Sequence, residues 1–392
     1  MAFESLIAYK YTILFYGLLF LFIYLNRKKF ETHAKIIFLY RTSWGIKLME
    51  KIAKKAGKYI KPLSIVGIYI GFIGMLFIIF LVLQGVYSVL FIPDAPPTVV
   101  PVIPGVPIPG SPIQVPLVVG WLALFIVVVI HEFSHGVVSK THKIPVKSSG
   151  ILFFGPLGGA FVEPDENKLK REKPQVQNAI FAAGPFSNVL TAGIFFLILT
   201  FIASPAMNTL VSDNGVLFDN VFPDKPAYQA GIRSDIIYTH INNREIKNYS
   251  VFTEELKATP PGNIITLSNE KGEHPITTIQ HPDNASISFI GITPGIILKN
   301  PDLSWIFAIV LFLTRLSIWI LILSLGLGLA NLLPLGPVDG GRMLQTTLGV
   351  FFGKKKGNKI WAKVTSVFIL ILIILLFPIF KEIFLALFGF LL

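Results

Sequence analysis

The sequence predicts an α-helical polytopic membrane protein with about six transmembrane helices and a small extramembrane domain of mixed helix and strand. Of its 392 residues, 53% are hydrophobic and 14% are charged, and the mean hydropathy is +0.68. Soluble domains carry about 25% charged residues. Six apolar stretches are also long enough for a membrane crossing, which takes about 20 residues of helix. These observations exclude a soluble enzyme, a disordered tail and a fibrous repeat.

The six predicted spans differ mainly in what connects them. They cover residues 5–26, 63–92, 117–138, 178–203, 303–333 and 364–391. The first span lacks the basic start and the cleavage site of a signal peptide, so we count it as a helix. Between the first two spans, residues 44–61 predict a basic amphipathic helix on the membrane surface. Nine prolines in 93–116 predict an extended connector there, with a cap over a cleft as the alternative.

The net charge of +12 follows the membrane topology rather than a nucleic-acid surface. Lys and Arg concentrate in three stretches that flank the apolar spans: 27–62, 139–176 and 342–363. Cytoplasmic loops carry such an excess of positive charge. If these stretches are cytoplasmic, both termini and the segment 206–297 lie outside. We therefore expect the lipid bilayer as a partner and no nucleic acid.

A metal-binding pattern lies inside the third span. His131 and His135 are four residues apart, so on a helix they share one face, and Glu132 stands beside them. This HExxH pattern is typical of a zinc site with the glutamate as general base. Ionisable residues within a membrane span are costly, which favours a function over a merely structural polar cluster.

Two histidines need a third protein ligand for a catalytic zinc site. The chain has no cysteine, so the third ligand should be His, Asp or Glu. Asp339 is the candidate that we favour, because prolines and glycines break the chain around it after the fifth span. Counted along their spans, Asp339 and His131 both fall toward the cytoplasmic half of the bilayer.

Two further segments have recognisable local patterns. Residues 151–154 and 160–162 are strand-like runs around a Gly/Pro turn, which predicts a hairpin. Such a hairpin can enter the membrane only where protein or a water-filled cavity shelters its backbone. Residues 206–297 predict a small separate domain, with strands at 216–221, 236–241, 264–267 and 276–279 and a helix at 249–258.

Together these motifs resemble the site-2 protease family of intramembrane zinc metalloproteases. HEFSH at 131–135 and NLLPLGPVDGGR at 331–342 are similar to its two metal-binding motifs. SGILFFGPLGGAFVEP at 149–164 resembles its membrane re-entrant β-hairpin. Gly184, Pro185 and Asn188 are similar to its Gly-Pro-x-x-Asn element. The resemblance covers 117–203 and 303–345, and it implies Asn188 as a hydrogen-bond donor to the oxyanion. An interhelical hydrogen bond is the alternative role for Asn188.

The inserted segment resembles a PDZ domain through PAYQAGI at 226–232, Asp235-Ile236-Ile237 and Ile241-Asn242-Asn243. Ser234 stands where a glycine is common in that pattern. The resemblance implies contact with a peptide or with the ectodomain of a substrate.

The domain boundaries follow from these assignments. We expect two N-terminal helices with their basic and Pro-rich loops at 1–116 and a C-terminal helix at 346–392. Between them, two catalytic segments at 117–203 and 303–345 lie on either side of a PDZ-like domain at 206–297.

The predicted function is zinc-dependent intramembrane endopeptidase activity on transmembrane segments of membrane proteins. Zn²⁺ held by His131, His135 and Asp339 lowers the pKa of a water to about 7, and Glu132 moves its proton. A substrate helix must unwind first, and a free edge of the hairpin is able to hold it by β-addition. The resemblance and the lack of cysteine favour a prokaryotic cytoplasmic membrane. The alternatives are an inactive scaffold that binds membrane segments and a metal-ion transporter.

Overall fold

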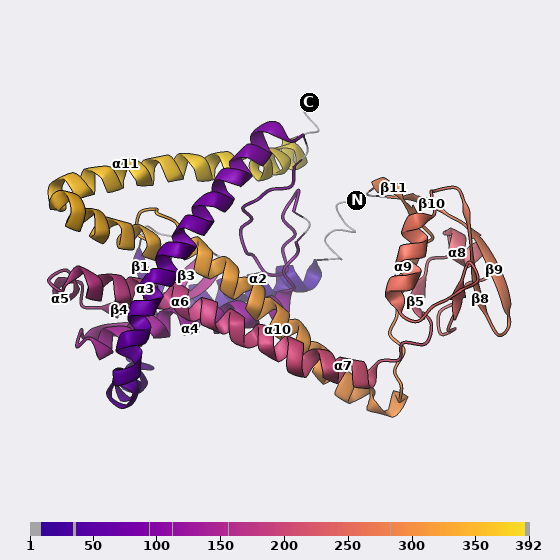
Figure 1. Ribbon diagram of the computed structural model, residues 1–392, viewed down its shortest axis with the longest axis horizontal. Coiled ribbons are helices and arrows are strands. Elements are labelled where there is room, and N and C mark those ends of the chain that lie inside the picture. The colour runs from indigo at the N-terminus through magenta and orange to yellow at the C-terminus, as the bar shows by residue number, and fades with distance from the viewer. Residues whose placement is uncertain are drawn as a thin grey trace. The chain divides into compact units, whose positions relative to one another are not determined.

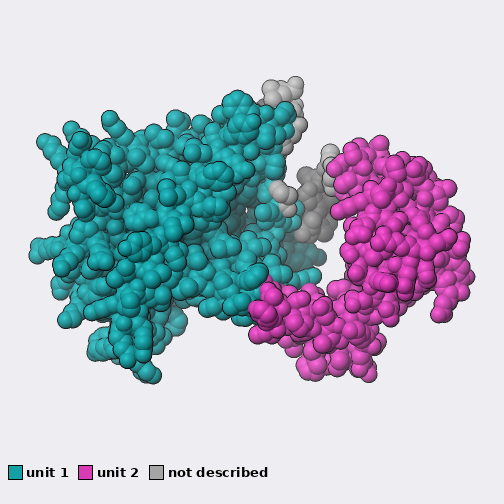
Figure 2. Space-filling model, in the orientation of Figure 1, with its two compact units in different colours: residues 1–198, 315–392 teal, residues 199–314 magenta. Residues whose placement is uncertain are grey.

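The computed structural model describes residues 9–33, 37–93, 95–111, 113–155, 157–282 and 284–388. It divides into two compact units (Figure 2). We call residues 1–198 with 315–392 the membrane unit and residues 199–314 the inserted unit. Figure 1 shows that the membrane unit is mainly helical and that the inserted unit is rich in strands.

Five helices in the described part of the chain are long and apolar enough to cross a membrane, as a polytopic helical membrane protein requires. They are α3 (Ile46–Phe91), α4 (Leu117–Thr141), α6 (Pro174–Ile198, continued by a π-type turn at Leu199–Ala203 and α7, Ser204–Leu210), α10 (Ser304–Asn331) and α11 (Asp339–Phe388). The expected span at 5–26 is described as α2 (Lys10–Leu25), a 16-residue helix that is shorter than a crossing needs. Residues 1–8 lie outside the described residues, so the sixth crossing stays a prediction.

Two expected element boundaries are wrong, because a helix continues across each of them. The surface helix at 44–61 and the span at 63–92 form the single helix α3, with Pro62 inside it. Proline removes one backbone hydrogen bond, but the lysine- and alanine-rich turns before it have high helix propensity. Residues 342–363, expected as a basic loop, belong to α11, whose two arms meet at a sharp bend (Figure 1). Gly353 makes that bend with a positive φ of 73°.

A four-stranded antiparallel sheet contains the predicted hairpin. The strand order is β1 (Glu31–His33), β2 (Ile37–Thr42), β3 (Val146–Phe154) and β4 (Leu157–Pro164). In this register Ser149 pairs with both Thr42 and Val162. The β1–β2 pair was not predicted, because residues 27–62 were assigned to a loop and a helix. Entry of the hairpin into a membrane stays a prediction.

Arg41 in β2 links all four strands of this sheet, because its side chain bonds residues of β1, β3 and β4. Its guanidinium donates to Glu31 at 2.8 Å, to Ser148 at 2.9 Å and to the carboxylate of Glu163. These interactions raise the pKa of Arg41 above its ordinary value, with the hydrogen bond to Glu31 as the largest cause. The cation therefore holds β1 and β4 to the two central strands.

The interior of the membrane unit lies where α3, α4, α6 and α11 pack. One buried cluster joins side chains from all of these helices, including Met75, Val138, Phe181, Ala182 and Met343. A short helix, α5 (Glu166–Leu169), follows β4.

The Pro-rich segment has no helix or strand among its described residues, as expected for an extended connector. It is nevertheless packed into the bundle. Val99 and Val102 lie against two buried clusters, and the Pro104 carbonyl accepts a 2.8 Å hydrogen bond from Tyr16.

The inserted unit has its own apolar core around Phe218, Tyr238, Phe252 and Ile265. Apart from α7 and the first turns of α10, which belong to the spanning helices, its α-helices are α8 (Pro226–Gln229) and α9 (Tyr249–Ala258). Its strands are β5 (Phe218–Val221), β6 (His240–Ile241), β7 (Arg244–Glu245), β8 (Ile264–Asn269), β9 (Gly272–Thr277), β10 (Ile279–His281), β11 (Asn284–Phe289) and β12 (Ile292–Pro294). They form one four-stranded sheet, β7-β6-β8-β9, and two pairs, β10-β11 and β12-β5. The PDZ-like assignment stays a prediction.

Candidate metal centre

The two predicted histidine ligands lie side by side on α4, one turn apart. Only 4% of His131 and 9% of His135 is exposed. Their Nε2 atoms are 3.3 Å apart. The local pattern is sufficient for this arrangement, because residues four apart share a face of any α-helix.

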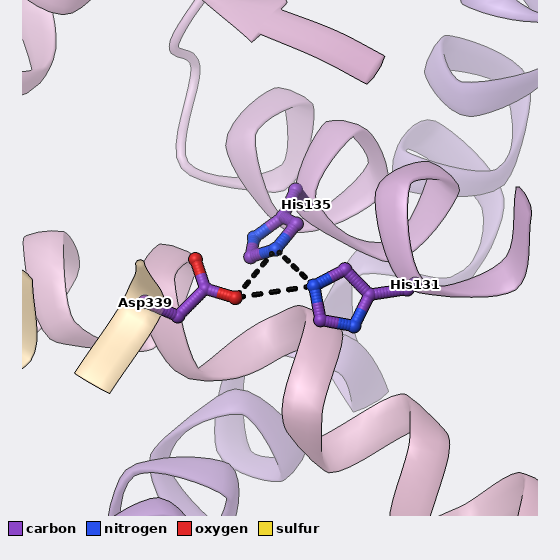
Figure 3. Close-up of side chains that lie close together, drawn as sticks. All are labelled: His131, His135 and Asp339. Atoms are coloured by element: carbon purple, nitrogen blue, oxygen red, sulfur yellow. Dashed lines mark hydrogen bonds and ion pairs between the residues drawn. The ribbon is translucent and has the colours of Figure 1, made fainter. Parts of the chain in front are cut away.

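Asp339 joins the histidines from a distant part of the chain. After α10 the turn at 332–338 contains Pro334 and Pro337, and Asp339 is the first residue of α11. Its Oδ2 atom lies 3.1 Å from Nε2 of His131 and 3.3 Å from Nε2 of His135 (Figure 3). The three predicted ligands therefore meet inside the membrane unit.

These donor atoms fit a zinc ion. A tetrahedral Zn²⁺ with nitrogen and oxygen ligands at about 2.0 Å separates neighbouring ligand atoms by about 3.3 Å. The observed separations of 3.1 to 3.3 Å agree with that spacing. Two imidazoles and one carboxylate also match the donor set of catalytic zinc sites, which keep a fourth position open.

Gly184 on α6 provides the space beside these nitrogens. A Cβ atom at this position would lie 2.4 Å from Nε2 of both His131 and His135. No side chain can be accommodated at that distance without displacing the rings. The glycine of the Gly184-Pro185 pair is thus required by the close approach of α6 to the candidate ligands.

Helix α6 also contacts the second ring nitrogen, Nδ1, of each histidine. Nδ1 of His135 lies 2.7 Å from the Ile180 carbonyl, and Nδ1 of His131 lies 3.2 Å from Nδ2 of Asn188. Metal-binding histidines commonly have such partners, which fix the ring orientation and the tautomer. The predicted oxyanion role of Asn188 stays a prediction, since its fully buried side chain lies against His131.

Glu132 is directed toward the sheet. Its Oε2 atom accepts a 3.0 Å hydrogen bond from the backbone N–H of Val162 in β4. Its carboxylate also lines a cavity between α4 and the sheet. The predicted general base is thus held by the strand that follows the Gly/Pro turn.

Sequence reasoning missed the groups that support the predicted ligands. Gly184 was noted only through its family resemblance, and the backbone of Val162 leaves no signal in a sequence. Arg342, one turn after Asp339, belongs to the 331–342 motif, but the sequence indicates no separate role for it. Its guanidinium lies 2.5 Å from the Glu166 carboxylate and 4.2 Å from the centre of the Phe181 ring.

The fold is a bundle of membrane-spanning helices, and its site combines an HExxH histidine pair with a distant aspartate. These two features place the protein in the class of membrane proteins with a metallopeptidase-type centre. Residues 119–375, more than half of the chain, match the model of Peptidase family M50, and the chain belongs to this family of site-2 proteases. The resemblance inferred from the motifs is therefore confirmed.

Two curated proteins illustrate the range of its relatives. An uncharacterised protein of Methanocaldococcus jannaschii, MJ0971, is 28% identical over 318 residues, which cover 79% of this chain and 77% of the relative. The zinc metalloprotease RasP of Oceanobacillus iheyensis is 24% identical over 221 residues, which cover 44% of this chain and 51% of the relative.

Proposed function

We propose that this protein is a zinc-dependent intramembrane endopeptidase that cleaves transmembrane segments of membrane proteins. The observation that carries the proposal is the convergence of Nε2 of His131, Nε2 of His135 and Oδ2 of Asp339, with separations of 3.1 to 3.3 Å, inside a helical membrane unit. Membership of Peptidase family M50 and the named activity of the RasP relative support zinc as the ion and peptide hydrolysis as the reaction.

The chain's own residues have separate tasks in this reaction. His131, His135 and Asp339 would hold the zinc ion. When bound, zinc acts as a Lewis acid toward the substrate carbonyl and lowers the pKa of a water. Glu132 accepts one proton of the attacking water, whose oxygen bonds to the peptide carbon. Glu132 then delivers that proton to the leaving amine nitrogen as the C–N bond breaks. Asn188 remains the candidate donor to the oxyanion.

Strand β4 is the candidate binding edge for the unwound substrate. Its neighbour β3 pairs with it on one side, and in the described part of the sheet β4 is the last strand. An extended peptide added to this edge would run past Val162, whose N–H holds Glu132. This arrangement supports β-addition as the way in which the scissile bond approaches the base.

We further propose a prokaryotic cytoplasmic membrane as the location, with the site toward the cytoplasm and the inserted unit outside. The basic composition of 27–62, 139–176 and 342–363 supports this orientation. The inserted unit would then face substrate ectodomains, as a PDZ-like peptide binder or as a steric filter.

The decisive experiment compares the purified protein with Glu132→Gln in liposomes. Both are offered a panel of single-span substrates, and the zinc content of each is measured. We expect cleavage by the unsubstituted protein alone, with about one zinc per chain in both proteins.

Other outcomes would favour the alternatives. Equal cleavage by both proteins would remove Glu132 as the base. Zinc transport into liposomes without any peptide release would favour a transporter, although the described residues provide one cluster of three ligands rather than a series along a path. A folded protein that retains no zinc and binds membrane segments would support the scaffold.

A further inference from the structure

A cavity of about 670 Å³ lies in the membrane unit next to the candidate base. One face of the sheet forms its floor. Two cross-strand rows supply most of this floor: Tyr40, Ile151 and Ala160 in the first, and Thr42, Ser149 and Val162 in the second. Gly150 and Phe161, which form the row between them, also line the cavity. Side chains directly opposite one another on adjacent strands share a face of the sheet. The first and second rows are two residues apart along each strand, so both lie on the same face and line the same cavity.

Helices close the cavity from the other side. The first turn of α3 contributes Leu48 and Met49, and α4 contributes Phe125, Val129 and Phe133. The lining is overwhelmingly apolar, and its two charged residues are Lys47 and Glu132. An apolar wall of this kind favours apolar groups, because a charged side chain would lose part of its hydration against it without a matched partner.

The cavity exists because β4 carries small side chains on the face that it turns toward the middle of α4. Gly158, Ala160 and Val162 lie on one face of the strand. Val162 reaches α4, since a methyl group at Gly136 would lie 3.2 Å from its Cγ1 atom. At the other end a Cβ at Gly158 would lie 2.8 Å from the Trp121 ring. Between these contacts, Ala160 offers only a methyl group opposite α4.

We propose that this cavity is the specificity pocket for a large apolar side chain, aromatic or branched aliphatic, on a substrate residue next to the scissile bond. The inference rests on the proposed peptidase activity. The position follows from Glu132, which lines the cavity and stands beside the ligand His131 in α4. The chemical class follows from the apolar lining, and the size lies within the 300–1,000 Å³ of typical ligand pockets.

Ala160→Leu tests the pocket directly, because the larger side chain narrows the cavity from its floor. The cleavage site of one single-span substrate is first located by mass spectrometry. Phe and Ala versions of the residues on each side of that site are then compared by kcat/KM. Gly159→Ala is the matched control, since it adds a methyl to the opposite face of β4, where Leu152 lies at an ordinary contact distance of 3.4 Å.

We expect the unsubstituted protein to prefer Phe over Ala at one of these positions by more than about tenfold. Ala160→Leu should reduce that ratio about tenfold or more while zinc content and cleavage of the Ala substrate persist. Gly159→Ala should keep the original ratio. Phe125→Ala enlarges the pocket from the helix side and should extend the preference to Trp, which keeps the test valid if Ala160→Leu fails to fold.

An unchanged Phe/Ala ratio in folded, zinc-loaded Ala160→Leu would overturn the pocket while leaving the peptidase in place. So would the absence of any gain for Trp in folded, zinc-loaded Phe125→Ala. A preference for charged side chains at both positions would also overturn it. If no protein of the series cleaves any substrate, the unsubstituted chain included, the proposed peptidase activity falls and this inference falls with it.

Discussion

The inserted unit and the membrane unit bury very different polar groups. Among the described residues of the inserted unit, the buried polar side chains are the hydroxyls of Thr278 and Ser288, and both donate to backbone carbonyls. The membrane unit buries two histidines, two asparagines and several hydroxyls. Among the residues of this unit that the structure describes, five buried polar atoms have no hydrogen-bond partner: Ser139 Oγ, Asn178 Oδ1, Asn188 Oδ1, Ser324 Oγ and Trp361 Nε1.

This difference separates a core built for stability from an interior built around a reaction. An unpaired buried polar group costs about 1–3 kcal/mol, so a structure selected for stability alone avoids it. In the described core of the inserted unit, each buried polar side chain has a hydrogen-bond partner. In the membrane unit, His131, His135 and Asn188 meet beside Asp339, where a metal centre gives polar groups a reason to be buried. Substitutions at the metal centre and in the inserted unit test whether this contrast is functional.

The largest effect is expected from Gly184→Ala. The new Cβ would lie 2.4 Å from both Nε2 atoms, so the rings must move apart and the metal centre should be lost. Metal analysis should find substantially less than one zinc per chain, with no cleavage. Gly193→Ala is the control on the same helix, because its Cβ would meet nothing within 4 Å. One tightly bound zinc in Gly184→Ala would place the ion elsewhere.

Val162→Pro should give the next largest effect. It removes the N–H that donates to Glu132, and this N–H faces away from β3, where an edge strand tolerates proline. We expect turnover to fall on the order of 100-fold through misplacement of the base, with zinc content unchanged. Val162→Ala shortens the same side chain but keeps the N–H. Equal losses in the two variants would assign the effect to the side chain instead.

Asn188→Ala separates two roles for this residue. If Nε2 of His131 binds the ion, its Nδ1 carries a proton and needs an acceptor. The unpaired Oδ1 of Asn188 supplies one when its amide turns by 180°. As a support for His131, Asn188 should contribute about 10- to 100-fold to zinc affinity.

As an oxyanion donor alone, Asn188 would contribute to kcat and leave zinc affinity unchanged. Competition with a fluorescent chelator measures the affinity. Asn178→Ala is the control, because this buried amide on α6 bonds Thr347 rather than a ligand.

The parts of the site that could be predicted from the sequence are those set by local geometry. Four-residue spacing on a helix is enough to bring His131 and His135 together, and the prolines and glycines around Asp339 indicated a break in the helix there. The helical bundle followed from apolar runs of the length of a bilayer crossing.

The parts that could not be predicted depend on contacts between distant segments. The pairing of β2 with β3 joins residues about 110 positions apart, as Tyr40 and Ile151 illustrate. The bond from Val162 to Glu132 uses a backbone group, which is the same in every residue type except proline. The helical course of 342–363 was hidden by its lysines, which suit a basic loop and a helix equally.

The smallest effect on the metal centre should come from Ile265→Val in the inserted unit. Ile265 is fully buried in that unit's apolar core, and loss of one methylene should lower its free energy of unfolding by about 0.5–1.5 kcal/mol. Hydrogen exchange of the amides in β8 and β9 would report this loss. Zinc affinity should stay unchanged, because no candidate ligand belongs to this unit. A fall in zinc affinity would mean that folding of the insert supports the metal centre, and the two regions would then have to be treated as one cooperative structure.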